Sequence, residues 1–371
     1  MDTQPAALDQ KIGDTSSPSG NTDPPGEDPT LKLAWERFAV YDHNAQLQQS
    51  SYNKLLLWIL ILGVVGTLLA LTQKQLTSPT PVTLSGPTWW VDFIKGLISS
   101  LRSVSPDIAS LLRYPIVIVP IATSVLLAAA NRFKSGHKWV LLRASAEAIK
   151  REIFSYRMRA GIYSDDQRAS AQASREAILS RQVEAITRAV SRTEVNSSAL
   201  RPYDGPIPPQ VAAGSDDGFT ALTPDRYIQI RLGDQINFYK LKTNGLERKM
   251  RRLQWSIYII GGAGTFLAAM GAELWIALTT AIVTAITAYL GHQQMEETLM
   301  SYNQAEADLE NILTWWTALS AAEKAEPSNI SKLVAETEKV LEGELAGWVR
   351  KMQEAVADRR QPKEDQRSSG A

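Results

Sequence analysis

The chain has 371 residues, and its 39 lysine and arginine residues are balanced by 39 aspartate and glutamate residues. This zero net charge gives no indication of a nucleic-acid-binding surface or of a general acidic partner. The absence of cysteine excludes disulfide bonds, thiol nucleophiles and cysteine metal ligands.

Residues 1–30 are predicted to form a disordered N-terminal tail, since Pro, Gly, Ser, Asp and Thr dominate them. A first, divergent membrane hairpin is expected in residues 31–163. Its spans are placed at residues 55–71 and 114–130, because each stretch is uncharged. Each is also close to the length of about 17–25 residues that a membrane-crossing helix needs.

The loop between these spans, residues 72–113, is expected to face the outer side of the membrane. Within it, residues 89–104 set apolar side chains along one helical face, which predicts an interfacial helix on the outer leaflet. Packing of that face against another part of the protein is the alternative. Pro115 and Pro120 predict a kink in the second span.

The middle of the chain, residues 164–222, is predicted to be a cytoplasmic helix followed by a linker rich in proline and glycine. A second hairpin is expected in residues 223–320, with spans at residues 255–270 and 274–290. A C-terminal cytoplasmic helix is predicted at residues 328–358, where apolar residues recur at helical spacing. Residues 359–371 are predicted to be a second disordered tail.

Glu273 interrupts an otherwise uncharged stretch from Leu253 to Leu290. Because a carboxylate at the centre of a bilayer costs about 2.5–3.5 kcal/mol, we expect Glu273 at the tip of a tight hairpin. Gly271 supplies the permissive backbone for this reversal. The alternative, one long buried helix of a soluble core, would leave the carboxylate unpaired.

Clusters of lysine and arginine flank the middle segment, after the second span and before the third. Since cytoplasmic loops carry an excess of these residues, the middle segment and both termini are expected inside the cell. The predicted fold is an all-α membrane protein. Its four transmembrane helices form two hairpins with long cytoplasmic helical extensions.

Two pairs of similar segments indicate that the hairpins are tandem repeats. The segment GTLLA at residues 66–70 matches GTFLA at residues 264–268, and AEAIKREI at residues 146–153 matches AEADLENI at residues 305–312. The same order around two hairpins predicts a duplication.

The segment RLGDQINFYKLK, residues 231–242, precedes a basic helix, a glycine-containing span, a very short turn, a second span and a long polar helix. This order resembles the bacterial uncharacterised-domain family 4231. That family belongs to the SLATT superfamily of two-transmembrane effector domains associated with nucleotide-sensing conflict systems. The resemblance is clearest over residues 223–319. Residues 32–163 resemble the family only through the duplication, where Arg37 and a displaced Tyr41 survive of the motif.

The motif residues Arg231, Gln235, Tyr239 and Lys242 share one helical face, because they are four, four and three positions apart. Such a face can bond to the polar helix that leaves the same hairpin. A structural clasp between the two helices is one interpretation, and a ligand-sensing or gating contact is the other. On the polar helix, the expected partners are Glu296, Glu297, Tyr302, Asn303 and Glu306.

We expect no enzyme, because the three histidines have no partner at metal-ligand spacing and no phosphate-binding glycine loop or nucleophile elbow is present. No catalytic, cofactor or metal residues are therefore predicted. The small residues Gly66, Gly261, Gly262 and Gly264 are expected to allow close approach of helices.

Two classes of function remain open, an oligomeric pore or ion channel and a non-conducting scaffold whose cytoplasmic helices recruit a partner. Thr280, Thr284 and Thr287 recur at helical spacing and are candidate pore-lining residues, although threonines also mediate ordinary helix packing. In a symmetric pore Glu273 would form a ring at the outer mouth. The family resemblance favours the pore, in the bacterial inner (plasma) membrane. It implies a membrane-permeabilising defence effector, for which a separate sensor protein is a possible partner. A homo-oligomer is expected because four spans can barely enclose a water-filled path alone.

Overall fold

The computed structural model describes residues 28–77, 88, 92, 96, 113–133, 135–165, 173–209, 216–270 and 274–358. In these residues every regular element is a helix, and there is no β-strand. The elements in chain order are α1 (Pro29–Thr77), α4 (Arg113–Phe133), α5 (Ser135–Arg157), the 3-10 helix η1 (Gly161–Tyr163), α7 (Arg175–Ser191), the 3-10 helix η2 (Glu194–Ser197), α8 (Pro224–Tyr227), the π-helix η3 (Ile228–Leu232), α9 (Gly233–Ala269), α10 (Leu274–Gln293), α11 (Met295–Ala318), α12 (Ala321–Lys324) and α13 (Pro327–Asp358).

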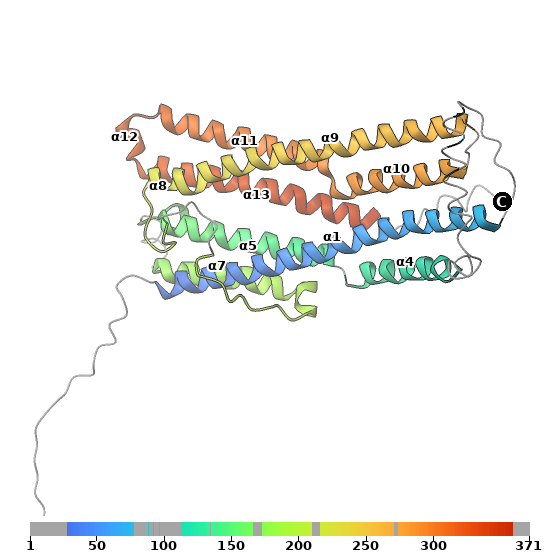
Figure 1. The fold of residues 1–371 in the computed structure, drawn as a ribbon. Coiled ribbons are helices and arrows are strands. Elements are labelled where there is room, and N and C mark those ends of the chain that lie inside the picture. The colour runs from blue at the N-terminus through green and yellow to red at the C-terminus, as the bar shows by residue number, and fades with distance from the viewer. Residues whose placement is uncertain are drawn as a thin grey trace, which may run out of the picture.

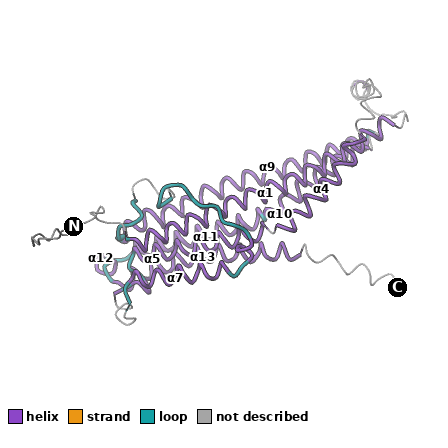
Figure 2. Tube along the Cα trace, turned by 90° about the horizontal axis from the view of Figure 1, so that it is seen from below, coloured by secondary structure: helices purple, strands orange, loops and turns teal. Residues whose placement is uncertain are grey.

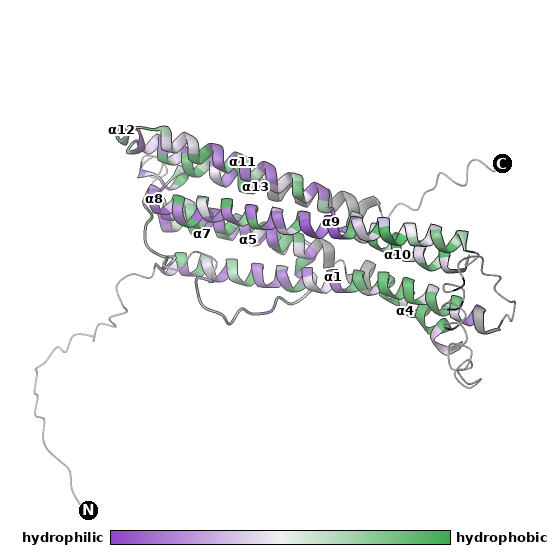
Figure 3. Ribbon diagram, turned by 45° about the horizontal axis from the view of Figure 1, so that its top comes forward, coloured by the Kyte–Doolittle hydropathy of each residue, from purple (hydrophilic) through white to green (hydrophobic). Residues whose placement is uncertain are grey.

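The helices lie side by side in an elongated bundle whose two ends differ in character (Figures 1 and 2). At one end, α5, α7, α11, α13 and the N-terminal parts of α1 and α9 form what we call the helical body. At the other end, α4, α10 and the C-terminal parts of α1 and α9 form the apolar end, which is coloured hydrophobic in Figure 3. The long helices α1 and α9 therefore connect the two ends.

The helical body has a buried core of its own. On α1, Leu31, Trp35 and Phe38 point inward because they are spaced three and four residues apart. They pack with Ile149 and Ile153, which repeat the same spacing on α5. Buried residues of α7, α9, α11 and α13 complete this core, so the body is packed in the manner of a soluble helical domain.

The apolar end exposes its large hydrophobic side chains. Trp58 and Ile118 are each 58% exposed, and Ile259 is 66% exposed. By length and composition, two helical stretches within the described residues could cross a membrane, Pro29–Lys74 and Trp275–Ala318. No part of either apolar window is buried, which distinguishes these stretches from the core helices of a soluble protein. This end therefore presents the surface expected next to lipid.

The four predicted spans differ in whether the helix that contains them is long and apolar enough to cross a membrane. The spans predicted at residues 55–71 and 274–290 lie in the two long apolar stretches. The span predicted at residues 114–130 lies in α4, which is a shorter apolar helix and continues through Pro120. The span predicted at residues 255–270 lies at the end of α9, which is not among the candidate spans of the described residues.

One helix of the second hairpin is continuous and the other is interrupted. The helix α9 runs from the body to the apolar end without a break. Between α10 and α11, however, Gln294 adopts the left-handed conformation with φ of 45°. Since residues other than glycine rarely adopt this conformation, Gln294 marks a definite change of direction between the apolar end and the helical body.

Several predicted features fall outside the described residues. These are the tip residue Glu273, nearly all of the interfacial helix predicted at residues 89–104, and residues 1–27 and 359–371 of the two tails. The middle helix predicted within residues 164–222 is α7, and the helix predicted at residues 328–358 is α13.

Candidate functional site

A buried ion pair lies in the helical body where the two halves of the chain meet. The π-helix η3 places Arg231 between the buried residues Ile230 and Leu232, and Arg231 itself is only 2% exposed. Its Nε and Nη2 donate hydrogen bonds to the two carboxylate oxygens of Glu338 on α13, at 2.9 and 2.7 Å. Such two-point pairing is the strong form of an arginine–carboxylate contact.

Two aromatic residues enclose the pair. The Tyr227 hydroxyl donates to Oε1 of Glu338 at 3.0 Å. Burial raises the pKa of this hydroxyl, and the negative charge of Glu338 adds to the effect, so Tyr227 remains a donor. On the other side, the guanidinium of Arg231 lies 4.7 Å from the ring centre of Phe154 on α5. Its remaining Nη1 is buried with no hydrogen-bond partner among the described residues.

The first half of the chain adds two charged residues of α5. The Lys150 side chain lies over the ring of Phe38 at 5.5 Å, and the residue is 8% exposed. Burial lowers the pKa of Lys150, although the charge of Glu147 opposes this change. Burial works against the ionisation of Glu147, but attraction to Lys150, Arg143 and Arg231 holds the pKa of Glu147 below its ordinary value.

We call Tyr227, Arg231, Glu338, Phe154, Lys150 and Glu147 the junction cluster. It joins η3 and α13 of the second half to α5 of the first. Its charges are balanced, and each stabilises the ionised form of another, as an internal ionic network must. Its chemistry is that of a clasp that holds three helices in one arrangement.

The four motif residues do not act together as predicted. Arg231 was expected to bond to the polar helix α11, but its partner is Glu338 on α13. Tyr239 does contact α11, since its ring centre lies 5.4 Å from that of Tyr302. Gln235 is half-buried, whereas Lys242 is exposed and lies over the ring of Phe238. Arg231 lies in the π-helix η3, whereas Gln235, Tyr239 and Lys242 lie in α9, so the helical face predicted from spacing does not run through all four residues.

Sequence analysis missed Glu338, which lies 107 residues from Arg231 along the chain. One signal was present, because Glu338 is four residues after the buried Val334 and three before Leu341. A carboxylate on the apolar stripe of a helix requires a buried partner. The identity of that partner depends on how α13 packs, which spacing alone does not show.

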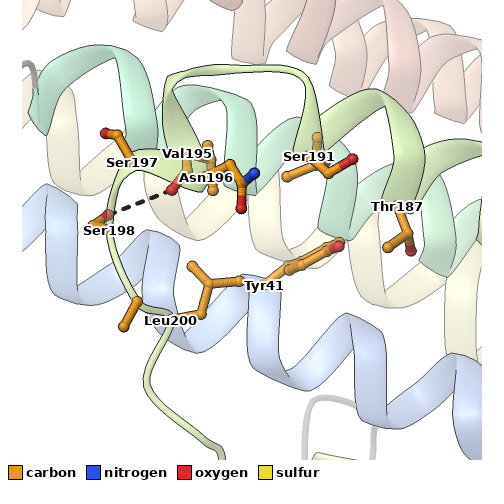
Figure 4. A pocket seen from close by; sticks show the side chains of 10 residues that line it. Tyr41, Thr187, Ser191, Val195, Asn196, Ser197, Ser198 and Leu200 are labelled. Carbon is orange, nitrogen blue, oxygen red and sulfur yellow. Dashed lines mark hydrogen bonds between the residues drawn. The ribbon is translucent and has the colours of Figure 1, made fainter.

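The divergent motif residues of the first half lie apart from the junction cluster. Arg37 is exposed on α1, while Tyr41 is 3% exposed and lines a pocket of about 410 Å³ between α1, α7 and η2. Figure 4 shows Tyr41 extending toward Thr187 and Ser191 of α7. The lining carries hydroxyl and amide groups and no charged side chain, so it offers nothing to neutralise a phosphate group or a metal ion.

Two of the four predicted packing glycines lie at close helix contacts in the apolar end. A Cβ added to Gly66 would meet Cγ1 of Val119 on α4 at 3.2 Å, and one added to Gly264 would meet Oγ1 of Thr279 on α10 at 2.5 Å. A Cβ added to Gly261 or Gly262 would meet nothing within 4 Å on another helix of the described chain. Each hairpin therefore has one glycine, at the start of its GTLLA or GTFLA segment, against its own second apolar helix.

The candidate pore residues Thr280, Thr284 and Thr287 are all exposed on α10. The neighbouring Thr279 makes the close contact with Gly264 of α9. The three threonines are thus free to meet another molecule. Glu273, the remaining candidate, lies outside the described residues.

The two hairpins also contact each other between α1 and α10. The rings of Tyr52 and His292 are 5.3 Å apart, and the Gln293 amide donates to the Asn53 side chain at 3.3 Å. These contacts lie where the apolar end meets the helical body. The halves are therefore joined there as well as at the junction cluster.

Comparison with protein families gives a match for each half. Residues 227–348 match the family described as SMODS and SLOG-associating 2TM effector domain 1, SLATT_1. Residues 36–171 match DUF4231, a family of proteins of unknown function. These are two different domains in one chain. The matches are those of a SLATT-type protein. No curated protein and no solved structure matches the chain.

The two matches refine the family assignment made from the sequence. The resemblance to family 4231 was placed most clearly in the second half, but the model of that family matches the first half. The second half matches the SLATT effector family instead. This second match contains η3, α9, α10, α11 and part of α13, and therefore includes both Arg231 and Glu338. The ion pair of the junction cluster thus lies within the residues that match SLATT_1, and Phe154 on α5, which contacts it, lies within the residues that match DUF4231.

Proposed function

We propose that this SLATT-type protein is the membrane-permeabilising effector of a bacterial defence system and that several copies form a pore in the inner membrane. The observation that carries the proposal is the contrast between the helical body and the apolar end. The body has its own buried core, whereas no part of the membrane-length apolar windows is buried. Exposed apolar surface costs about 25 cal/mol per Å² in water, and a bilayer removes this cost.

In this proposal α1, α4, α9 and α10 each cross the membrane, and the helical body lies in the cytoplasm with both termini. The short α4 and the end of α9 are accommodated because each packs against a long apolar helix, α4 on α1 and α9 on α10. The basic residues of α9 directly precede its predicted span, which supports this orientation.

The exposed small and hydroxyl residues of the second hairpin support an assembly of several copies. Thr280, Thr284 and Thr287 on α10 are exposed, and a Cβ added to Gly261 or Gly262 on α9 would meet no other helix of the described chain within 4 Å. Small residues let membrane helices approach closely, and hydroxyl groups line water-filled paths. Four helices alone barely enclose such a path, so further copies are needed to complete it.

The name of the matched family supports the effector role and a separate partner, because it describes an effector domain that associates with SMODS and SLOG. We propose that a separate sensor protein acts on the helical body. There the junction cluster connects α13 with both halves of the chain. A movement of α13 would therefore displace Arg231 on η3 and change its contact with Phe154 on α5.

Conductance of the purified full-length protein in a planar bilayer tests the pore. We expect an ionic current across the bilayer only when the protein is present. The current should be smaller when Thr280, Thr284 and Thr287 are replaced together by valine. Thr314→Val is the matched control, since Thr314 is also exposed but lies on α11 in the helical body, where its hydroxyl donates to the carbonyl oxygen of Glu310 at 2.8 Å. Absence of current from correctly inserted protein would favour the scaffold alternative.

Labelling in intact cells tests the orientation separately. Cysteines introduced at Thr80 and Glu273 are expected to react with an impermeant maleimide, whereas one introduced at Ser197 is not. Because the natural chain has no cysteine, each variant has a single reactive thiol. The reverse labelling pattern would refute the proposed topology.

A further inference from the structure

One face of α9 changes along the helix from basic residues to a tryptophan and a tyrosine and then to fully apolar residues. Arg248, Arg251 and Arg252 are exposed and are followed on the same face by Trp255 and Tyr258, which are 60% and 67% exposed. The positions are three and four residues apart, so the side chains lie in one row. Ile259 and Phe266 continue the row toward the apolar end. We call Arg248, Arg251, Arg252, Trp255 and Tyr258 the basic–aromatic face.

The arginines of this face are anchored but not neutralised. Nε of Arg248 donates to the carbonyl oxygen of Asn244 at 3.0 Å, and Nε of Arg252 donates to that of Arg248 at 3.3 Å. Neither guanidinium forms an ion pair with a residue of the described chain. Arg251 has only a long contact of 3.8 Å with the exposed Glu247. The Nη groups of Arg248 and Arg252 thus remain available to an outside anion.

The positive charge is confined to one helix of the hairpin. From Leu253 to Glu323, which includes α10 and α11, the sequence contains no lysine or arginine. On α1, Lys54 directly follows Asn53, whose side chain accepts a hydrogen bond from Gln293 at the end of α10. Orientation in a membrane depends on the number of positive charges beside a span and does not require them on one exposed face. Their alignment with two aromatic side chains calls for a further explanation.

We propose that the basic–aromatic face binds the phosphate headgroup of an anionic phospholipid in the cytoplasmic leaflet. The inference rests on the proposed function, in which α9 crosses the membrane. At 1.5 Å per residue, the Cα of Arg252 lies about 4.5 Å and that of Arg248 about 10.5 Å along the axis from Trp255. The headgroup layer on each side of a bilayer is about 5–8 Å thick.

The three parts of the face match the three parts of such a lipid. Tryptophan and tyrosine favour the boundary between headgroup and acyl chain, which places Trp255 and Tyr258 there. Arg251 and Arg252 then lie at the level of the phosphate groups, Arg248 lies at the aqueous edge of the headgroup layer, and Ile259 and Phe266 lie beside the acyl chains. A guanidinium suits phosphate because it donates several hydrogen bonds in a fixed plane. The site selects a negatively charged headgroup because no carboxylate neutralises Arg248 or Arg252.

Lipid retention by the full-length protein tests the inference. The protein in a neutral detergent is mixed with dioleoyl phosphatidylglycerol or dioleoyl phosphatidylcholine, and bound lipid is counted by native mass spectrometry. We expect preferential retention of phosphatidylglycerol. In Arg248→Gln/Arg252→Gln its affinity should fall on the order of tenfold, because each basic residue near an anionic surface contributes severalfold. Replacement of both by lysine should retain most of the affinity, since the charge is kept.

The matched control replaces two exposed arginines of the helical body, Arg181→Gln/Arg192→Gln, and should retain phosphatidylglycerol like the natural protein. Free glycerol phosphate added in excess should not displace the lipid, because it lacks the chains that Ile259 and Phe266 contact. Unchanged affinity in Arg248→Gln/Arg252→Gln, equal retention of phosphatidylcholine or displacement by glycerol phosphate would each overturn the inference.

The lipid measurement is independent of pore activity. Protein that retains phosphatidylglycerol through these arginines but carries no current refutes the pore and supports the lipid site. Protein that conducts and is labelled at Glu273 as proposed, but shows no dependence of lipid retention on Arg248 and Arg252, refutes the lipid site alone.

Discussion

Arg231 and Glu338 form a two-point ion pair inside the helical body, although 107 residues separate them in the sequence. Their side chains are 2% and 4% exposed, so water does not compensate either charge. The pair connects the π-helix η3, at the entrance to α9, with the C-terminal helix α13. The position of α13 is therefore tied to the base of the hairpin that carries the candidate pore residues.

Removal of one member of this pair should strongly destabilise the helical body. In Glu338→Ala the buried Arg231 keeps its charge without a partner, and we expect the free energy of unfolding to fall by about 3–5 kcal/mol. Chemical denaturation in mild detergent, followed by tryptophan fluorescence, measures this change. The double variant Arg231→Met/Glu338→Leu should recover much of the loss, since it leaves no unpaired charge. Glu310→Gln breaks the exposed pair with Lys240 and should have little effect.

Substitutions at two glycines of α9 should distinguish the packing of α9 against α10 within one chain from the packing between copies. Gly264→Val forces its new side chain against Thr279, where even a Cβ would lie 2.5 Å from Oγ1. We expect it to destabilise the α9–α10 pair by about 1–3 kcal/mol, as overpacked substitutions do. Thermal unfolding in detergent provides the measurement.

Gly261→Val is the matched change on the same helix, with nothing within 4 Å of the new Cβ in the described chain. It should leave the thermal unfolding of the single chain unchanged. In the proposed assembly it should nevertheless shift the mass distribution in native mass spectrometry from oligomer to monomer, because a small contact residue has been enlarged. An unchanged oligomer would place Gly261 on a surface that faces only lipid.

Glu147 should make the helical body less stable in acid. Attraction to Lys150, Arg143 and Arg231 outweighs burial and holds the pKa of Glu147 below its ordinary value of 4.5. Its contribution to stability is therefore complete above pH 4.5, where the unfolded chain also carries the charge, and is lost as the pH falls through the lower folded pKa. Denaturation midpoints measured from pH 7 downward should show this loss.

In Glu147→Gln the loss of stability below pH 4.5 should be smaller than in the natural protein. The variant should also be less stable at neutral pH, because Lys150 no longer has this carboxylate nearby. Glu336→Gln, which changes an exposed ion pair with Lys339 on α13, serves as the control and should keep the natural pH dependence. Identical pH profiles for Glu147→Gln and the natural protein would contradict the assigned role.

Glu273 should influence ion selectivity if copies of the second hairpin surround the pore. A ring of carboxylates at the outer mouth attracts cations, so Glu273→Gln should weaken cation preference and Glu273→Lys should shift it toward anions. Reversal potentials under a salt gradient measure both changes, which should be larger at low salt because charges are then less screened. Glu310→Gln in the helical body is the control. Unchanged potentials in conducting variants would mean that Glu273 only marks the turn.

Much of the helical architecture could be predicted because helix formation and apolar length are local properties. Uncharged runs near Leu55 and Leu274 are long enough to cross a membrane wherever they lie in the fold. The helical spacing of apolar residues likewise predicted α7 and α13. The tandem duplication stays a prediction because helix positions do not show a common origin of the two halves. The four-span topology stays a prediction because helix positions do not show where a bilayer lies.

The partners of individual polar residues were less accessible from sequence. The motif residues around Arg231 were assigned to the helix that follows in the chain, and for Tyr239 this was correct because Tyr302 lies on α11. For Arg231 it was wrong, because Arg231 lies in a π-helical turn and its side chain pairs with Glu338 on α13. Spacing rules assume a regular α-helix, and one additional residue in a turn changes the face that a side chain occupies.

The sequence by itself therefore determined that the chain is helical, that it contains apolar segments near Leu55 and Leu274 long enough to cross a membrane, and that its hairpins contain small residues at defined positions. Those properties follow from neighbours within one or two helical turns. Only the tertiary structure decided that Gly264 rather than Gly261 contacts α10, and that Glu338 neutralises Arg231 beside Phe154. These contacts join segments far apart in the chain, and they depend on the packing of whole helices rather than on the order of residues within any one of them.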